Sequence, residues 1–167
     1  MKYLFTVAFL AIGCIVQAQK LPTEPADAFA FPLGTKFVIK LVPIDSVNYN
    51  YSILSFEPFR EIVDMKKSNF DELFEKSGED STIVFYFCLG THGETDQEKR
   101  KNMQTLLLIK NYSKEKLQYT SEIQVKEDGE YEWTSNVGMW PNIIMYEMWP
   151  YMIYYIGLKE LKKDTGK

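Results

Sequence analysis

Residues that build metal sites and nucleophilic sites are scarce in this sequence. Its 167 residues include two cysteines and one histidine, whereas a zinc site takes three or four ligands, several of them usually Cys or His. The sequence also lacks a Gly-x-Ser-x-Gly elbow and a glycine-rich phosphate loop. It therefore predicts no cofactor and no metal, and no motif in it identifies an enzyme.

Basic charge is also low. The chain has 19 Lys and Arg against 23 Asp and Glu, a formal net charge of −4. Nucleic-acid phosphates favour clustered Lys and Arg, and the dense basic run at 99–101 is preceded by three acidic residues within 94–98. We expect no nucleic-acid partner, and we interpret 90–103 as a solvated, charged loop.

The N-terminus has the layout of a secretory signal peptide. A single early lysine precedes an uncharged, mostly apolar run over 4–16, which is shorter than the roughly 20 residues that cross a bilayer. We expect a signal peptide over 1–18, cleaved between Ala18 and Gln19. The mature protein is then exported, to the periplasm or the medium of a bacterium, and is not integral to a membrane. The alternative is a lipid anchor at Cys14.

Cleavage would leave one cysteine, Cys88, so an internal disulfide is excluded. Cys88 lies inside an apolar run, where a lone cysteine is usually a small buried hydrophobe. The mature chain must therefore be held together by packing.

The rest of the chain is long enough for one domain. Three prolines stand among small residues between 19 and 34, which predicts an extended leader, with Phe29 and Phe31 packing onto the domain. The domain itself covers 35–161, and 162–167 forms a polar tail.

Two uninterrupted apolar runs, 82–89 and 105–109, are rich in β-branched, aromatic or leucine residues. Runs this short and this apolar predict strands that are covered on both faces. Alternating residues at 36–44 and 51–56 add further strands, and we expect another at 143–148.

One short helix is expected around 69–77. Ser68 is a candidate N-cap, Asp71 stands at the third helical position, and Gly78 follows as a stop signal.

The segment 117–126 alternates apolar and polar residues, as a strand with one wet face does. We expect it to turn through the three-residue loop 127–129, with Gly129 at positive φ. That loop length pairs Ile123 with Trp133 and predicts a buried Trp133 indole.

The segment 151–161 fits two structures. A helix would begin at Pro150 and end near two lysines, whereas a strand would alternate its aromatic and aliphatic residues. The β-branched and aromatic content favours a strand. The helix gives an alternative fold, an α+β protein with a C-terminal helix.

The segment 106–123, which contains Leu-Leu-Leu-Ile-Lys-Asn-Tyr-Ser-Lys-Glu-Lys-Leu-Gln-Tyr, resembles a phrase in exported bacterial immunoglobulin-like domains. There an apolar strand ends in Asn and re-enters as an alternating strand. The resemblance covers under a fifth of the chain and implies an antiparallel β-sandwich without implying an activity. The hallmark cysteine pair is absent. The predicted fold is therefore a mostly β, immunoglobulin-like sandwich with one short helix, although the pattern does not distinguish a sandwich from a closed barrel.

The only histidine, His92, stands in Gly-Thr-His-Gly-Glu, near Glu94 and Asp96. These three residues are the best polar-site candidates for an enzyme, such as a small hydrolase. Cys88 and His92 do not form a nucleophile–base pair, because an extended strand would place them about 13 Å apart. We expect the histidine to be a solvated loop residue.

Aromatic residues concentrate between 131 and 155. Most must be core, but Trp140, Pro141, Trp149 and Tyr151 combine rigid aromatic area with prolines, which favours partner binding. The leading hypothesis is an exported, non-enzymatic module that binds a protein, peptide or glycan. The alternatives are the hydrolase near His92 and a β-barrel that holds an apolar ligand.

Overall fold

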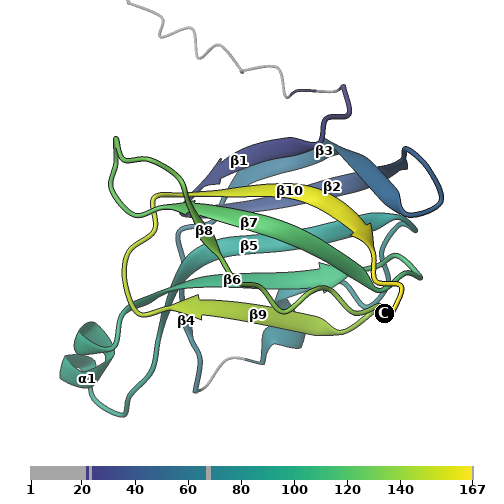
Figure 1. Ribbon diagram of the computed structural model, residues 1–167. Coiled ribbons are helices and arrows are strands. Elements are labelled where there is room, and N and C mark those ends of the chain that lie inside the picture. The colour runs from purple at the N-terminus through teal and green to yellow at the C-terminus, as the bar shows by residue number, and fades with distance from the viewer. Residues whose placement is uncertain (1–21, 23, 67–68, 167) are drawn as a thin grey trace, which may run out of the picture.

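The computed structural model describes residue 22 and residues 24–66 and 69–166 (Figure 1). The strands are β1 (Ala28–Pro32), β2 (Thr35–Pro43), β3 (Asn48–Pro58), β4 (Ile62–Asp64), β5 (Thr82–Thr91), β6 (Gln104–Asn111), β7 (Leu117–Gln124), β8 (Glu132–Thr134), β9 (Ile144–Trp149) and β10 (Tyr155–Lys163), and the helices are the 3-10 helix η1 (Phe70–Leu73) and α1 (Asp96–Lys101). The expected signal peptide, its cleavage site at Ala18 and Gln19, and Cys14 lie outside the described residues.

The ten described strands belong to one hydrogen-bonded sheet that curls into a half-barrel (Figure 1). They pair in the order β8-β7-β10-β3-β2-β5-β6-β9, while β1 joins β10 and β4 joins β5. All pairings are antiparallel except that of β4 with β5. The prediction of a mostly antiparallel β protein is confirmed, whereas the two-layered sandwich is not confirmed.

The two apolar runs form adjacent strands that are covered on both faces, as predicted. In β5, Ile83, Phe85 and Phe87 enter the main cluster of buried residues, to which most strands contribute and which therefore fills the inside of the curl. Tyr86 and Cys88 enter a smaller cluster on the outer face. Each run lacks charged residues because each strand is in contact with apolar side chains on both sides.

The outer cluster is covered by η1 and β4. Phe74 and Val63 are buried there, together with residues of β5 and β6. The short helix expected at 69–77 is thus present only as a 3-10 helix of four residues, capped by the Asn69 side chain. Ser68, the N-cap we expected, lies outside the described residues.

The proline-containing segment contributes a strand, which the prediction of an extended leader missed. β1 pairs with β10 along its whole length, and Ala26 bridges to Tyr51 of β3. β1 therefore fills the space between β10 and β3, which pair directly only near Leu161. Phe31 is fully buried and stacks on Phe37 at 3.6 Å between ring centroids, so its predicted packing onto the domain is confirmed.

The strand interpretation of the C-terminal segment is confirmed for 155–161 by β10, and the C-terminal helix is wrong. β10 begins four residues later than expected and continues through Lys163, two residues into the predicted polar tail. Ile156, Leu158 and Leu161 face the core. The pairing with β7 shifts register between Lys159 and Lys162, which lets the buried face continue after an odd number of residues.

The β7–β8 hairpin differs from its prediction by one residue. Ile123 pairs with Glu132, and Trp133 pairs with Glu122. Because strand side chains alternate, this one-residue shift moves Trp133 to the outer face, where it is 71% exposed. The prediction of a buried Trp133 is wrong. Gly129 also has no positive φ; its amide donates to the carbonyl of Lys126 at 3.0 Å.

Within the described residues, no helix is both long enough and apolar enough to cross a membrane.

Candidate functional site

The strand order ends at β8, a short strand that covers only part of β7, and at β9, so the half-barrel is open between β7–β8 and β9, and the segment 135–143 crosses this opening (Figure 1). This segment is attached to both sides of the opening. Met139 and Leu117 of β7 exchange two backbone hydrogen bonds, and the Asn142 amide donates to the carbonyl of Asn111 at 2.7 Å. The crossing segment and β9 form the two walls of a cavity.

β9 places one carboxylate on its inward face. Met145, Glu147 and Trp149 alternate with residues that face outward, and both Met145 and Trp149 contact the main core cluster. Glu147 is therefore an acidic residue in an otherwise apolar stripe, opposite Leu107 of β6. Only 7% of it is exposed.

The Glu147 carboxyl group has two donors on one oxygen and none on the other. The Tyr119 hydroxyl on β7 and the Val137 amide (3.3 Å) both donate to Oε1. Oε2 is buried and has no hydrogen-bond partner. Burial raises the pKa of Glu147 to about 7, while the Tyr119 and Val137 hydrogen bonds act in the opposite direction. Burial also holds the pKa of Tyr119 well above its usual range, with the Glu147 charge adding to the effect.

The cavity beside Glu147 has a volume of about 450 Å³, within the range of small-molecule sites. Asn136 is fixed in its wall because its side-chain amide donates to the Tyr119 carbonyl at 2.6 Å. Trp149 is fixed because its indole N–H donates to Thr134 Oγ1 at 3.1 Å. The lining residues are Thr134, Ser135, Asn136, Val137, Tyr146, Glu147, Met148, Trp149 and Tyr151.

A second unsatisfied polar atom belongs to the facing strand. Ser121 Oγ of β7 is buried without a hydrogen-bond partner, and with Glu147 Oε2 it completes the set of such side-chain atoms among the described residues. Ser121 pairs with Thr134, which lines the cavity. Most buried polar atoms in proteins are hydrogen-bonded, so the strands that flank the opening are exceptional in this molecule.

The four predicted partner-binding residues are divided between two places. Trp149 and Tyr151 line the cavity, with Trp149 6% and Tyr151 47% exposed. Trp140 and Pro141 belong to the crossing segment but do not line the cavity. The Lys116 ammonium lies 3.9 Å from the centre of a Trp140 ring, and Pro141 forms a β-bridge with Asn111.

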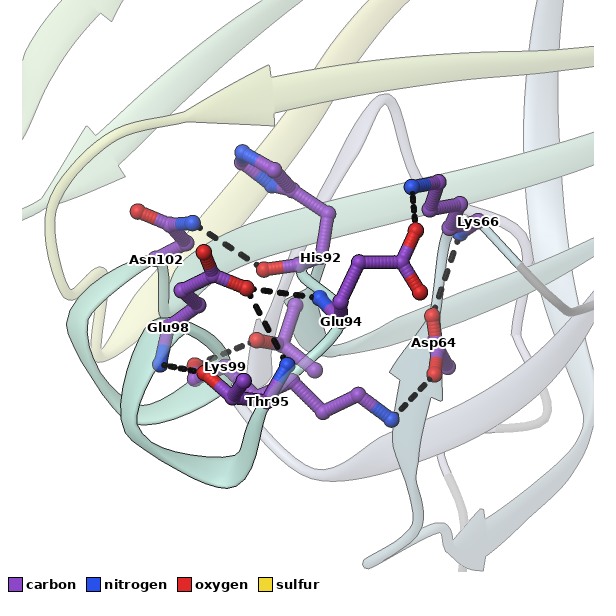
Figure 2. A network of polar contacts seen from close by, with 9 residues as sticks. Asp64, Lys66, His92, Glu94, Thr95, Glu98, Lys99 and Asn102 are labelled. Carbon is purple, nitrogen blue, oxygen red and sulfur yellow. Dashed lines mark hydrogen bonds and ion pairs between the residues drawn. The ribbon is translucent and has the colours of Figure 1, made fainter.

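The three polar-site candidates lie at a different corner, and they form no site there. Figure 2 shows the His92 ring pointing away from the ion pairs Lys66–Glu94 and Lys99–Asp64. His92 is exposed, and its carbonyl accepts from the Asn102 side chain at 3.0 Å.

The polar contacts at this corner stabilise α1 and the loop before it; we did not predict this helix. Thr95 and Glu98 form a capping box, and Asp96 is an exposed residue in the first turn. The Thr-x-x-Glu spacing was visible in the sequence and is the signal for this helix. No group of three potential metal ligands occurs among the described residues.

Cys88 is fully buried, and burial raises the pKa of its thiol to about 12. It is a core residue, and a thiolate at this position would be strongly disfavoured.

Sequence reasoning missed Glu147, Tyr119 and Asn136. The available signal was the parity of residues in the expected strand at 143–148, since Glu147 shares its face with Met145 and Trp149. The contact with Tyr119 had no local signal, because it depends on the curl of the sheet.

Comparisons of this chain with family models, curated proteins and solved structures gave no match.

Proposed function

We propose that the protein is an exported, non-enzymatic binding module whose ligand enters the cavity between β9 and the crossing segment 135–143. The observation that carries this proposal is Glu147 Oε2, a buried carboxylate oxygen without a partner beside a cavity of about 450 Å³. Oε2 has no solvent-exposed surface, so a ligand that donates a hydrogen bond would satisfy it after a small movement of the cavity wall. Aromatic side chains at the same cavity supply contact area at a low entropic cost.

Binding is favoured over catalysis by the chemistry of the lining. Hydrolysis usually needs a second acid, base or nucleophile beside the first. Of the cavity-lining residues, Glu147 is the only carboxylate, and the lining includes no His, Cys, Lys or Arg. The Thr134 and Ser135 hydroxyls also line the cavity, but the Glu147 carboxyl is hydrogen-bonded to Tyr119 and Val137 and to neither hydroxyl. The neighbouring Tyr119 phenol is held as a hydrogen-bond donor with a raised pKa.

A general acid–base role for Glu147 is the second candidate. The observation in its favour is the pKa of about 7, which suits proton transfer near neutral pH. His92 is a weaker centre for an enzyme, because its ring is exposed and points away from the nearby ion pairs.

A barrel that holds an apolar ligand is not favoured, because side chains already fill the interior. Phe31, Phe37 and Phe85 stack in sequence there, with centroid separations of 3.6 and 4.8 Å.

The proposal includes export, which the sequence pattern of 1–18 supports. It also includes kinship with exported bacterial immunoglobulin-like domains, which the resemblance at 106–123 supports. Intact-mass analysis of secreted material tests export. We expect a chain that begins at Gln19, and a diacylated chain that begins at Cys14 would instead indicate a membrane anchor.

The binding site is tested by NMR with a defined panel: methyl β-glucoside, N-acetyl-trialanine amide, n-butanol, n-butylamine and butyrate. We expect at least one compound to shift the Trp149 indole N–H and Asn136 side-chain signals. We expect Tyr151→Ala to weaken that compound and Trp140→Ala, outside the cavity, to leave it unchanged. Shifts confined to other surfaces, or turnover of chromogenic esters or glycosides that Glu147→Gln abolishes, would contradict the proposal.

A further inference from the structure

Glu147 is a buried acidic group without a cationic partner. In the described part of the chain, seven ion pairs join Lys to Asp or Glu, and none includes Glu147. Other acidic residues near the sheet edges do have a lysine, such as Glu122 with Lys159 at 2.6 Å. A buried charge is normally paired because leaving it unpaired costs several kcal/mol in a low-dielectric interior.

The contacts that Glu147 does have suit an ionised carboxylate. Both the Tyr119 hydroxyl and the Val137 amide donate to Oε1, and hydrogen bonds of this kind favour the charged form. They satisfy one oxygen and leave Oε2 unsatisfied. What the site lacks is therefore a donor, and a donor that also carries positive charge.

The remainder of the cavity is suited to a cation. Two aromatic residues, Trp149 on the same face of β9 as Glu147 and Tyr151 just after the strand, line it, and the faces of aromatic rings attract ammonium groups. No Lys, Arg or His is among the lining residues to repel a cation or to pair with Glu147 in its place. An anionic ligand would meet the carboxylate unfavourably, and a neutral hydroxyl would satisfy Oε2 but leave the charge uncompensated.

We propose that this cavity recognises an ammonium group, with the Glu147 carboxylate as its counter-charge and Trp149 and Tyr151 as its aromatic contacts. This inference rests on the proposed function and names its ligand class. The ammonium is either that of a free small amine or that of a lysine side chain on a polypeptide, and both present the same chemistry to Glu147.

The inference includes a pH dependence. The Glu147 carboxyl is faced by the Tyr119 phenol from β7 and the Val137 amide from the crossing segment, and its direct partner on β6 is apolar. The cavity lining adds two further phenols and no other acid or base. Glu147 is therefore the group that titrates near neutrality, and binding should tighten roughly tenfold between pH 6 and pH 8 as it ionises.

The test uses n-butylamine, n-butanol and butyrate, which share a chain and differ in charge. At pH 8 we expect n-butylamine to shift the Trp149 indole signal and to bind at least tenfold more tightly than n-butanol, with no binding of butyrate. Glu147→Gln should abolish the preference for the amine. Glu122→Gln, which removes a carboxylate outside the cavity, should retain it.

The two sources are distinguished with N-acetyl-Gly-Lys-Gly-amide. If this peptide binds at least tenfold more tightly than n-butylamine, the ligand is a lysine of a polypeptide, and if it binds with any lower affinity, the ligand is a free amine. Tyr151→Ala, at an exposed rim position, should weaken both without disturbing the fold, and so provides a second variant should Glu147→Gln perturb the structure.

Equal binding of n-butanol and n-butylamine, or an unchanged amine affinity in Glu147→Gln, would overturn the inference. If methyl β-glucoside or n-butanol shifts the Trp149 signal while n-butylamine does not, the ammonium inference is wrong, but the proposed binding function is retained. If neither any of the panel compounds nor the lysine peptide shifts the Trp149 signal, the proposed function fails together with the inference.

Discussion

The Tyr119 hydroxyl donates a hydrogen bond to Glu147 Oε1, and this contact joins β7 to β9. Five strands lie between these two in the pairing order of the sheet. The contact therefore spans the open side of the half-barrel, where the curl brings distant strands face to face. It depends on the curvature of the sheet as a whole, and it positions the one cavity-lining carboxylate.

Replacing Glu147 by Gln should change how stability depends on pH. The pKa of Glu147 is raised from 4.5 to about 7 in the folded state, so the folded protein holds this proton more tightly than the unfolded chain does. That stabilisation is complete below about pH 4.5 and is lost as pH rises through 7. Wild type should therefore lose about 3 kcal/mol relative to Glu147→Gln across this window, since a tenfold change in proton affinity is about 1.4 kcal/mol.

Urea unfolding at pH 4, 5, 6, 7 and 8 measures this difference, with Glu122→Gln as the control. Parallel pH profiles of wild type and Glu147→Gln would show that Glu147 titrates normally.

Replacing Tyr51 by Phe should destabilise the protein by about 1–3 kcal/mol, because it leaves two backbone groups without a partner. The Tyr51 hydroxyl donates to the Leu158 carbonyl at 2.6 Å and accepts from the Phe29 amide at 2.8 Å. Chemical denaturation measures the loss. Tyr155→Phe, at a position 38% exposed, is the matched control and should change stability by less than about 0.5 kcal/mol. Equal effects of the two changes would mean that the Tyr51 hydroxyl is not needed where β1 enters the sheet.

Replacing Gly78 by Ala should destabilise the protein by about 1–3 kcal/mol through overpacking. A Cβ at this position would lie 2.5 Å from Cγ of Tyr112, whose hydroxyl is held by the Glu75 carbonyl at 2.6 Å. The control is Gly157→Ala, since a Cβ there would meet its nearest atom at an ordinary 3.7 Å. An unchanged melting temperature for Gly78→Ala would show that the Tyr112 ring moves aside freely.

Single-tryptophan variants should rank in acrylamide quenching as Trp133, then Trp140, then Trp149. Their exposed fractions are 71%, 43% and 6%, and quenching follows access of the small quencher to the indole. A shielded Trp133 would restore the hairpin register that pairs it with Ile123.

The sequence predicted those elements whose signal is local. The uninterrupted apolar runs at 82–89 and 105–109 marked β5 and β6 because both faces of those strands are buried. Alternation likewise located β7, and β-branched and aromatic content favoured β10 over a helix. In each case, whether one or both faces of a strand are buried determines the residue pattern of that strand.

Features that depend on pairing partners could not be predicted in this way. The order of strands in the sheet, and hence the half-barrel, leaves no trace in any one segment. The predicted register of Trp133 was wrong by one residue. Because side chains alternate between the two faces of a strand, a shift of one residue moves each side chain to the opposite face. β1 was missed because Pro32 and its neighbours favoured the interpretation as an extended leader. Pro32 is in fact the last residue of the strand, a position where a proline is tolerated.

The interior position of β10 has a consequence for how the chain comes to fold. β10 is last in chain order, yet β1, β3 and β7 all take it as a neighbour. A nascent chain that still lacks β10 has a gap in mid-sheet and leaves β1 without its ladder partner. The sheet is therefore completed only after β10 has left the ribosome, and long-range pairing of this kind is slow. For the export that we propose, late completion of the sheet would keep the chain unfolded for longer and so compatible with passage through a membrane translocase.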